Sequence, residues 1–407
     1  MNQEDFEFLI KPEVRALIEA NLDTNPRDFA LNHKNNGNLS PLVPSQIKNL
    51  QKSKKKIPSF YHARCIIPNQ AYEQCSSEKA AQMRHFSGKN CLDLTCGLGV
   101  DTFIYTQNFE SVTSLERNPV YCEIAKYNFQ QLGVTNVKII NTSAEDYLDQ
   151  YSGPPFDLIY ADPSRRDTDG NRLKDINTFS PNIISLLTRL TSLSSRILFK
   201  LSPLFDLNEA YNIFPEATSV SIISIDNECK ELWVEINQME KSSSSGRSIP
   251  LNVLLNKQDK LYSFVFPETV SFPIEKALEF SEYQYIIEPD TAFYKGRINR
   301  HLFHKYFPHL NGYLNHDTGF FFCKELPDQL DFPGRVFKII TSFPYKPKVI
   351  PKKLKALKIN RLNITKRFFP FSVKEIRKAL NVEDGGEMTL LCTQWESKKQ
   401  VFLAESV

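Results

Sequence analysis

Residues 91–101 read CLDLTCGLGVD, and the rest of the chain is organised around this stretch. The run from Cys91 to Leu94 is typical of a buried strand, and Gly97 and Gly99 follow it in a tight turn. Glycine lets the backbone approach a ligand closely, and strand-to-helix turns of this kind hold nucleotide-like cofactors in doubly wound α/β folds. The stretch therefore predicts a cofactor turn at the carboxyl end of a buried strand.

Length and composition indicate a globular protein of more than one domain. The chain has 407 residues, of which 41% are hydrophobic and 24% charged, and one hydrophobic core usually stops growing at roughly 250–300 residues. The N-terminal residues lack a signal-peptide pattern, and no apolar run approaches the ~18 residues of a membrane span, so we predict a cytoplasmic protein. The eight cysteines include no CxxC pair, which predicts reduced thiols and neither a disulfide framework nor a metal site.

Strand-like and helical segments alternate between residues 91 and 240. After the first strand, strand-like runs occur at 112–116, 137–141, 156–162 and 196–202. Repeated strand–helix units predict a parallel, doubly wound sheet with helices on both faces. Two further runs, VSIISI at 220–225 and ELWVEIN at 231–237, predict a closing hairpin with an antiparallel strand. The serine-rich run at 239–248 then marks the clearest domain boundary.

These patterns predict four parts in the chain. They are a helical N-terminal region at 1–87, the doubly wound domain at 88–240, a small α+β ferredoxin-like domain at 249–332 and a basic α+β domain at 333–407. Within the first part, Ser76 or Ser77 is predicted to cap a helix whose start can fold over the cofactor pocket. Fourteen Lys or Arg and one acid lie between Arg335 and Leu380, although the net charge of the whole chain is only +3. Such segregation of charge favours a polyanionic partner.

Acidic residues around the glycine turn distinguish between cofactors. Thr102 stands where a dinucleotide-binding fingerprint has its third glycine, which disfavours NAD and FAD. Asp93 precedes the turn, and an acid there suits a cationic cofactor without phosphates. Glu116 ends the second strand, where a carboxylate can accept both ribose hydroxyls of an adenosine. This combination predicts S-adenosyl-L-methionine.

Several short motifs together resemble one known family. CLDLTCGLGVD, SLERNP at 114–119, SAEDYL at 143–148 and YADPSRRD at 160–167 are similar to successive motifs of class I S-adenosylmethionine-dependent methyltransferases. Further matching pieces are EQCSSE at 73–78, KLSP at 200–203, NECKELWV at 227–234, YIIEPD at 285–290 and KRFFPFSVKEIRKAL at 366–380. With these, the chain resembles the bacterial class I methyltransferases that carry a C-terminal THUMP-like domain. The resemblance implies a Rossmann-like sheet followed by a THUMP-like domain at 333–407.

The resemblance also implies cofactor contacts at the turn and at the ends of the following strands. The residues concerned are Asp93, Cys96, Gly97, Gly99, Glu116, Ser143, Ala144, Glu145 and Asp162. Thr95 departs from the family pattern, which often has another glycine there. Ser143 replaces an acid that often contacts the adenine amino group, which leaves the adenine contact open between Ser143 and Glu145.

The predicted catalytic residues follow the fourth and fifth strands. Asp162 and Pro163 resemble the (D/N)PP(Y/F) motif of nucleic-acid amino methyltransferases, whose acid accepts hydrogen bonds from the target nitrogen. Ser164 and Arg165 replace the second proline and the aromatic residue of that motif, which leaves the target atom open. Lys200 either faces the substrate or lies at the surface end of its strand.

Arginines of the DPSRR motif are the first candidates for contacts with an RNA phosphate. Arg165 and Arg166 can clamp a phosphate bidentately or stabilise charge near the site, and Arg165 is for that reason also a predicted catalytic residue. The alternative is that they pair internally with Asp167 or Asp169. Further RNA-binding candidates in the basic domain are Lys352, Lys353, Lys355, Lys358, Arg361, Lys366 and Arg367, interleaved with Phe368, Phe369 and Phe371. Lysine and arginine match a phosphate backbone, and exposed aromatic rings stack on unpaired bases. The alternative is that the phenylalanines belong to the core and the lysines to a solvated face.

Taken together, the sequence predicts an S-adenosylmethionine-dependent methyltransferase that acts on RNA, such as tRNA or rRNA, through its basic C-terminal domain. Two other hypotheses stay open. One is an RNA-binding or scaffold protein with a vestigial cofactor site. The other is a methyltransferase for a small molecule or a protein, whose activity would not depend on the basic domain.

Overall fold

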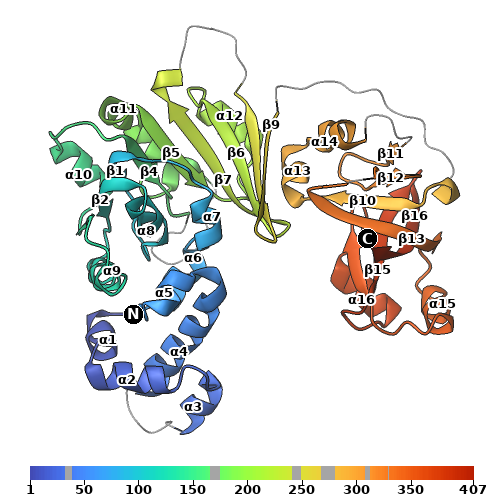
Figure 1. Cartoon of the computed structure of the whole chain (residues 1–407), viewed down its shortest axis with the longest axis horizontal. Coiled ribbons are helices and arrows are strands. Elements are labelled where there is room, and N and C mark those ends of the chain that lie inside the picture. The colour runs from blue at the N-terminus through green and yellow to red at the C-terminus, as the bar shows by residue number, and fades with distance from the viewer. Residues whose placement is uncertain (33–38, 166–174, 241–248, 267–279, 308–311, 329) are drawn as a thin grey trace. The chain divides into compact units, whose positions relative to one another are not determined.

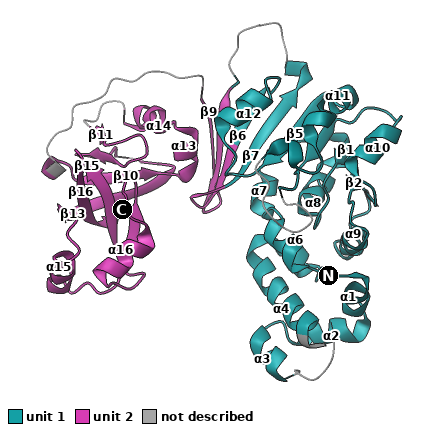
Figure 2. Cartoon of the chain, turned by 180° about the vertical axis from the view of Figure 1, so that it is seen from behind, with its two compact units in different colours: residues 1–221, 230–249 teal, residues 222–229, 250–407 magenta. Residues whose placement is uncertain are grey.

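The computed structural model of the chain describes residues 1–407 except 33–38, 166–174, 241–248, 267–279, 308–311 and 329 (Figure 1). It divides into two compact units, shown in different colours in Figure 2. The first unit comprises residues 1–221 and 230–249, and the second comprises 222–229 and 250–407. Every helix among the described residues is too short or too polar to cross a lipid bilayer.

The N-terminal region is helical, as predicted. Its helices are α1 (Gln3–Leu9), α2 (Pro12–Ala20), α3 (Pro26–Asn32), α4 (Leu39–Lys56), α5 (Pro58–His62), α6 (Asn69–Gln74) and α7 (Glu78–Gln82). Buried side chains of these helices, including Ile47 and Phe60, share one apolar core with Leu98 and Val100 of the glycine turn and the helix after it. The N-terminal helices therefore help to support the turn.

A mixed sheet forms the centre of the first unit. Its parallel strands are β1 (Gly88–Asp93), β2 (Phe109–Leu115), β3 (Val137–Ile140), β4 (Leu158–Ala161) and β5 (Arg196–Leu201), in the spatial order β3-β2-β1-β4-β5. The connecting helices are α8 (Val100–Thr106), α9 (Pro119–Gln131), α10 (Ala144–Gln150), α11 (Ile183–Leu193) and α12 (Leu207–Ile213). The strand order reverses between β1 and β4, and ligands of doubly wound folds bind at the carboxyl edge of such a switch point.

The predicted closing hairpin is confirmed. β7 (Glu228–Asn237) pairs antiparallel with β5, and β6 (Ser219–Ile225) lies on the far side of β7. This order brings β7 into the middle of the sheet, where both of its edges are paired. Short 3₁₀ helices occur at η1 (Ile176–Thr178), η2 (Gln238–Glu240) and η3 (Phe280–Glu282).

The second unit contains a hairpin and a second sheet. The hairpin strands are β8 (Leu251–Lys257) and β9 (Lys260–Phe266), and β8 lies beside β6, whose residues 222–225 belong to the same unit. The second sheet has the order β11-β12-β10-β13-β16-β15-β14. Its strands are β10 (Tyr285–Pro289), β11 (Gly312–Leu314), β12 (Phe321–Cys323), β13 (Gly334–Pro344), β14 (Asn363–Lys366), β15 (Met388–Trp395) and β16 (Lys398–Ser406). The helices of this unit are α13 (Thr291–Gly296), α14 (Asn299–Tyr306), α15 (Ile350–Ala356) and α16 (Val373–Leu380).

This second sheet differs from the division into 249–332 and 333–407 expected from the sequence. β10 pairs antiparallel with β13, from Tyr285 opposite Lys338 to Pro289 opposite Gly334. Side chains from both sides of the expected boundary, such as Phe322 and Phe402, share one core. Residues 285–323 and the basic segment therefore form one α+β body, because the backbone edge of β13 is satisfied by β10.

Candidate active site

Two glycines with left-handed backbone conformations shape the turn after β1. Gly97 has φ +55° and Gly99 has φ +89°. A Cβ atom at Gly99 would lie 2.8 Å from Cε2 of Phe129, so α9 packs closely against the turn only because this position is glycine. At Gly97, apart from its chain neighbours, no described heavy atom lies within 4 Å of the place that a Cβ would take. The turn thus has a packed side at Gly99 and an open side at Gly97, where a ligand has room.

Asp93 lies underneath the turn, on its packed side. Its buried carboxylate accepts hydrogen bonds from Thr95 N at 2.8 Å, Thr102 Oγ1 at 2.5 Å and Ser114 Oγ at 3.1 Å. Burial raises the pKa of Asp93 to about 6. Because no part of Asp93 is accessible, the direct cofactor contact expected of it is replaced by a role in fixing the loop. Cys96 is also buried, so only its backbone can face a ligand.

Glu116 connects the end of β2 to the open side of the turn. Its Oε2 accepts a hydrogen bond from Gly97 N at 3.0 Å, and its Oε1 accepts one from Asn118 N at 2.8 Å. Burial raises the pKa of Glu116, although these two N–H donors oppose the shift. Each carboxylate oxygen can accept a further hydrogen bond. The half-buried carboxylate is therefore placed to receive a pair of hydroxyl groups beside Gly97.

The segment after β3 is held mainly by a helix cap. Ser143 accepts a hydrogen bond from Asp146 N at 3.0 Å at the start of α10, and its own hydroxyl donates to Asp146 Oδ2 at 2.7 Å. Ala144 is buried, and Glu145 Oε1 accepts a hydrogen bond from Asn182 N at 3.3 Å. Since the Ser143 hydroxyl is engaged in the cap, Glu145 is the more available of the two candidates for an adenine contact.

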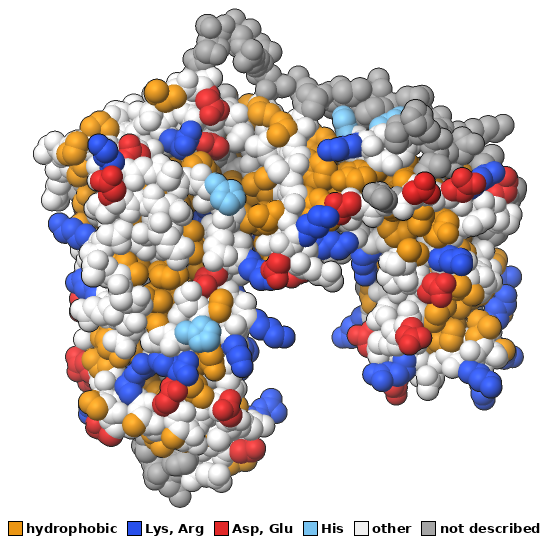
Figure 3. Space-filling view, in the orientation of Figure 1, with side chains coloured by type: hydrophobic (Ala, Val, Ile, Leu, Met, Phe, Trp, Pro, Cys, Tyr) orange, Lys and Arg blue, Asp and Glu red, His pale blue; other side chains and the backbone are white. Residues whose placement is uncertain are grey.

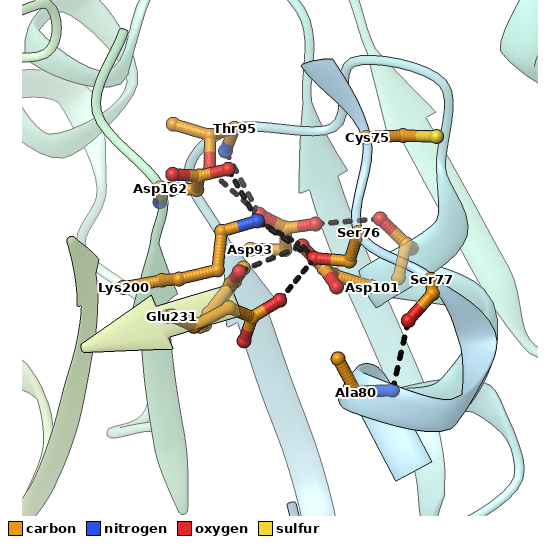
Figure 4. A network of polar contacts seen from close by, with 12 residues as sticks. Cys75, Ser76, Ser77, Ala80, Asp93, Thr95, Asp101, Asp162, Lys200 and Glu231 are labelled. Atoms are coloured by element: carbon orange, nitrogen blue, oxygen red, sulfur yellow. Dashed lines mark hydrogen bonds and ion pairs between the residues drawn. The ribbon is translucent and has the colours of Figure 1, made fainter. Parts of the chain in front are cut away.

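Charged side chains from distant parts of the first unit meet below the turn (Figure 4). The members of this buried charge network are Arg84, Asp101, Asp162, Lys200 and Glu231. They come from the segment before β1, from α8, from the end of β4, from β5 and from β7. In the sequence they lie far apart, and the fold brings them together at the carboxyl edge of the parallel strands.

Lys200 is the cation nearest to the predicted catalytic acid. Its Nζ donates to Asp162 Oδ2 at 2.5 Å, to Asp101 Oδ2 at 3.1 Å and to Ser76 Oγ at 2.8 Å. Burial alone would lower the pKa of Lys200, but the charges of the neighbouring carboxylates, including Glu231, raise the pKa above its ordinary value. The lysine side chain is only 8% exposed, so the alternative of a surface lysine at a strand end was wrong.

Arg84 is the second cation of the buried charge network and pairs with Asp101 and Glu231. Its Nη2 lies 2.5 Å from Asp101 Oδ1 and 3.5 Å from Glu231 Oε2, and its guanidinium lies 5.1 Å from the ring centre of Tyr160 and 5.5 Å from that of Trp233. Although burial alone would raise it, Arg84 and Lys200 hold the pKa of Asp101 below its ordinary value. With a side chain only 1% exposed, Arg84 is an entirely internal ion.

Asp162 is the most accessible carboxylate of the network. One third of its side chain (33%) is exposed, against 12% for Asp101 and 6% for Glu231. Its backbone N–H donates to Thr95 Oγ1 at 2.8 Å, which ties the acid to the glycine turn. Burial raises the pKa of Asp162 to about 6, although Lys200 opposes the shift. Asp162 is therefore the member of the network that a substrate can reach.

The rest of the DPSRR motif is only partly described. Pro163 is buried, and Ser164 pairs through its backbone with Ser180, with an N–O distance of 2.8 Å. Arg165 is half-buried directly after this bridge. Arg166, together with Asp167 and Asp169, lies outside the described residues.

Several network members were not assigned from the sequence. Ser77 caps α7 by accepting a hydrogen bond from Ala80 N, as expected, while Ser76 donates to Glu231 Oε1 at 2.7 Å and joins the network. A charged residue within an apolar strand was the available signal for Glu231, since buried charges require partners. Arg84 lies between α7 and β1, where the sequence gave no sign that its charge is buried.

The predicted RNA-binding residues of the second unit have different surroundings. Those on and after α15, namely Lys352, Lys353, Lys355, Lys358 and Arg361, are exposed. At the end of this unit that carries α15 and α16, Figure 3 shows Lys and Arg side chains with Asp and Glu side chains between them. Lys366 is half-buried and donates to Phe369 O at 3.1 Å. Arg367 donates from Nε to Glu288 Oε1 at 2.8 Å. Its charge is therefore partly used inside the protein, which the sequence did not show.

Two protein-family models match separate segments of the chain. Residues 85–246 match a family model described as a methyltransferase domain, and residues 334–406 match one described as THUMP domain-like. The chain carries a methyltransferase domain and a THUMP-like domain. The methyltransferase domain contains the glycine turn, Glu116 and most of the buried charge network. The resemblance expected from the sequence motifs is confirmed.

Related proteins agree with the methyltransferase domain over part of their length. The chain is 30% identical over 133 residues to a tRNA/tmRNA (uracil-C(5))-methyltransferase of Neisseria meningitidis, which covers 29% of this chain and 36% of that protein. It is 27% identical over 169 residues to an uncharacterised RNA methyltransferase of Mycoplasma mobile, which covers 41% of this chain and 45% of that protein. The chain thus spans less than half the length of these two relatives.

One solved structure matches the whole chain in fold. It is the crystal structure of a protein described as a putative methyltransferase from Porphyromonas gingivalis, with a TM-score of 0.79 and 23% identity, and the match covers 100% of this chain and 99% of that one. The doubly wound methyltransferase fold expected from the sequence is confirmed.

Proposed function

We propose that this protein is an S-adenosylmethionine-dependent RNA methyltransferase whose reaction takes place beside Asp162. The observation that carries the proposal is the position of Asp162. It is the accessible acid of a buried network, it is tied to the glycine turn through Thr95, and it lies 2.5 Å from the Lys200 ammonium. A cofactor on the open side of Gly97 and an acceptor at Asp162 would then lie on the same edge of the sheet.

The residues at the turn fit S-adenosylmethionine. Gly97 leaves space beside the backbone, and Glu116 offers two carboxylate oxygens that each accept only one backbone N–H. These two residues would hold the ribose, and Glu145 would border the adenine. When bound, S-adenosylmethionine supplies an electrophilic methyl group.

Asp162 and Lys200 would position the acceptor and its proton. The carboxylate of Asp162 can accept a hydrogen bond from an N–H of the substrate, which orients the nitrogen for attack. Lys200 keeps the carboxylate ionised by its adjacent positive charge. The neighbours Asp101 and Ser76 hold Lys200 in place, so the pair is fixed before the substrate arrives.

The thiols of the chain favour a nitrogen acceptor over the uracil carbon named for the Neisseria protein. Methylation of a pyrimidine carbon needs a nucleophile that first adds to the ring, and a thiolate is the usual choice. Burial raises the pKa of all eight cysteine thiols in this chain. Cys75, which adjoins Ser76 in the sequence, donates to Tyr72 O at 3.3 Å. The site thus offers an acid for a nitrogen and no activated thiol for a carbon.

RNA as the substrate is supported by the THUMP-like domain and by the exposed lysines of α15. These lysines would bind the phosphate backbone, whereas Arg367 would contribute less because Glu288 shares its charge. Arg166, outside the described residues, stays a candidate phosphate contact. A cytoplasmic location is part of the proposal, since RNA and S-adenosylmethionine are available there.

Labelled methyl transfer to RNA tests the proposed function. The full chain is incubated with methyl-labelled S-adenosylmethionine and with tRNA or rRNA from cells that lack this protein. We expect label in RNA, an N-methylated nucleoside by mass spectrometry, and weaker RNA binding as salt is raised. Label in a protein or a small molecule, with none in RNA, would contradict the RNA substrate. No S-adenosylhomocysteine release with any RNA pool would favour a vestigial site.

Calorimetry tests the cofactor separately from RNA. Glu116→Ala is expected to weaken S-adenosylmethionine binding on the order of tenfold to a hundredfold, because hydrogen bonds to a charged group are lost. Glu123→Ala is the matched control, since Glu123 is exposed on α9 and pairs only with Lys126 in this region. Equal affinities of the two variants would remove Glu116 from the cofactor site.

A further inference from the structure

Phe368 is unusual among the aromatic residues of the second unit. It is 38% exposed and is the only exposed phenylalanine among those whose side chains the structure describes. Its neighbour Phe369 is buried in the core, and Phe371 is packed against that core. The prediction that these phenylalanines belong to the core therefore holds for two of the three and is wrong for Phe368.

The Phe368 ring is stacked flat on an imidazole. The ring centres of Phe368 and His316 are 3.7 Å apart, and the two planes differ by 1°. Thr318 N donates to Nδ1 of His316 at 3.0 Å, which fixes the orientation of the imidazole. Because His316 covers one face of the phenyl ring, a further aromatic group can stack only on the other face. The two stacked rings form a flat aromatic surface in which His316 supports one face of Phe368.

The backbone at Phe368 is held in a conformation that its side chain disfavours. Its φ is +47°, in the left-handed region that a bulky residue rarely adopts. The carbonyl of Phe368 accepts a hydrogen bond from Gln394 N at 3.1 Å, and Arg367 N donates to Cys392 O at 3.1 Å. Residues held in this way cluster at ligand-binding positions. The ring packs on His316 and is still partly exposed, so it remains accessible to a ligand.

Positive charge lies next to this surface in the chain. Glu288 is fully buried, and both Arg335 and Arg367 pair with its carboxylate. Two guanidinium groups on one carboxylate leave this cluster with a net charge of +1, and the Arg335 side chain is 43% exposed. The guanidinium of Arg367 also lies 4.0 Å from the ring centre of Tyr294. Arg335 is therefore the cation of this cluster that an anionic ligand can reach.

We propose that Phe368, backed by His316, is a stacking platform for an unpaired base of RNA. An aromatic face beside positive charge is the arrangement by which proteins bind single-stranded nucleic acid, with the base on the ring and the phosphate on the cation. The proposal rests on the proposed function in that its ligand is RNA, and it adds that the recognised segment is single-stranded.

Phe368→Gly removes the ring without straining the fold. Glycine adopts a φ of +47° freely, so the variant is expected to unfold at the same temperature as the wild type or a higher one. Its affinity for a single-stranded oligoadenylate of roughly 10–12 nucleotides is expected to fall about 5- to 100-fold. Leu357→Ala is the matched control, because Leu357 is 49% exposed in the same unit, and its affinity should stay within about twofold of the wild type.

An abasic oligonucleotide of the same length separates stacking from charge. Phe368→Trp places an exposed indole on the platform, while Trp233 and Trp395 are buried. We expect oligoadenylate to quench the new tryptophan fluorescence and the abasic chain to leave it unchanged. Two results together would contradict the stacking platform: equal binding of both oligonucleotides by the wild-type chain, and wild-type affinity in Phe368→Gly. The proposal of an RNA substrate would be unaffected by them. If the wild-type chain binds neither oligonucleotide, the stacking platform is overturned, and labelled methyl transfer to tRNA or rRNA decides the RNA substrate separately.

Discussion

Asp162→Asn is expected to lower the turnover of methyl transfer by about 10²- to 10⁴-fold, the range typical of a lost proton acceptor. Asparagine keeps the size of the side chain but presents one acceptor oxygen without a charge. Lys200 would stay paired with Asp101 and Ser76, so the network should persist. Because Asp162 acts on the acceptor, kcat should fall much more than the affinity for S-adenosylmethionine.

The pH dependence gives a second readout for the same residue. Burial raises the pKa of Asp162 to about 6, although the charge of Lys200 opposes it. The ionised carboxylate is the form that accepts a proton, so the wild-type rate should rise with pH through about 6 and then level off. In Asp162→Asn this rise should disappear. A purely structural role for Asp162 would leave the pH profile unchanged.

Asp175→Asn provides the control for this experiment. Asp175 follows β4 like Asp162 but is exposed and caps the 3₁₀ helix η1. Its replacement should leave kcat within about twofold of the wild type. If Asp162→Asn also turned over at the wild-type rate, Asp162 would have no part in accepting the proton.

Arg84→Met is expected to lower the free energy of unfolding by about 3–5 kcal/mol, the usual effect of removing one partner from a buried ion pair. Methionine has a similar length and no charge, so Asp101 and Glu231 would lose a cation within the protein. Asp101 would still contact Lys200, whereas Glu231 would keep hydrogen bonds from the neutral donors Ser76 and Trp233 but no direct ion pair among the described residues. The loss should therefore come mainly from uncompensated charge.

Arg64→Met is the matched control for Arg84→Met. Arg64 pairs with Glu19 at 2.6 Å, a distance close to the 2.5 Å of the Arg84–Asp101 pair. Its side chain is 29% exposed and that of Glu19 is 54% exposed, so water stabilises the remaining charge. The same substitution should cost only about 0–1 kcal/mol there.

Urea unfolding followed by tryptophan fluorescence measures both variants. A Trp395→Phe background leaves Trp233, which lies inside the network and reports on the first unit. Adding Glu231→Gln to Arg84→Met should recover part of the lost stability, because it removes a charge that no longer has a partner. If Arg84→Met and Arg64→Met lowered the free energy of unfolding equally, burial of the charge network would not explain its contribution to stability.

The sequence predicted the features that depend on local pattern. Repeated strand–helix units, the glycines at 97 and 99, and an acid at the end of β4 are visible in short stretches, and the fold and the turn followed from them. The alternation of strands likewise predicted the antiparallel β7. The cap at Ser77 needed only its immediate neighbours.

Contacts between distant segments required the tertiary structure. The antiparallel strand β7 and the segment before β1 bring Ser76, Arg84 and Glu231 to one place, and no spacing in the sequence encodes that meeting. Asp93 was expected to face a ligand, but hydrogen bonds from Thr102 and Ser114 hold it under the turn. The sequence of a strand shows which residues share one of its faces. It does not show which other segment will pair with the edge of that strand.

The glycine turn was thus predictable from the sequence alone, because a tight turn and a strand-end acid are local requirements of the backbone, and the proposal of S-adenosylmethionine as the methyl donor starts from these two features. Tertiary structure decided which charges are buried together and which aromatic ring stays exposed. Burial sets the pKa of Asp162, the pairing of Arg367 and the exposure of Phe368, and burial is a property of the packed chain.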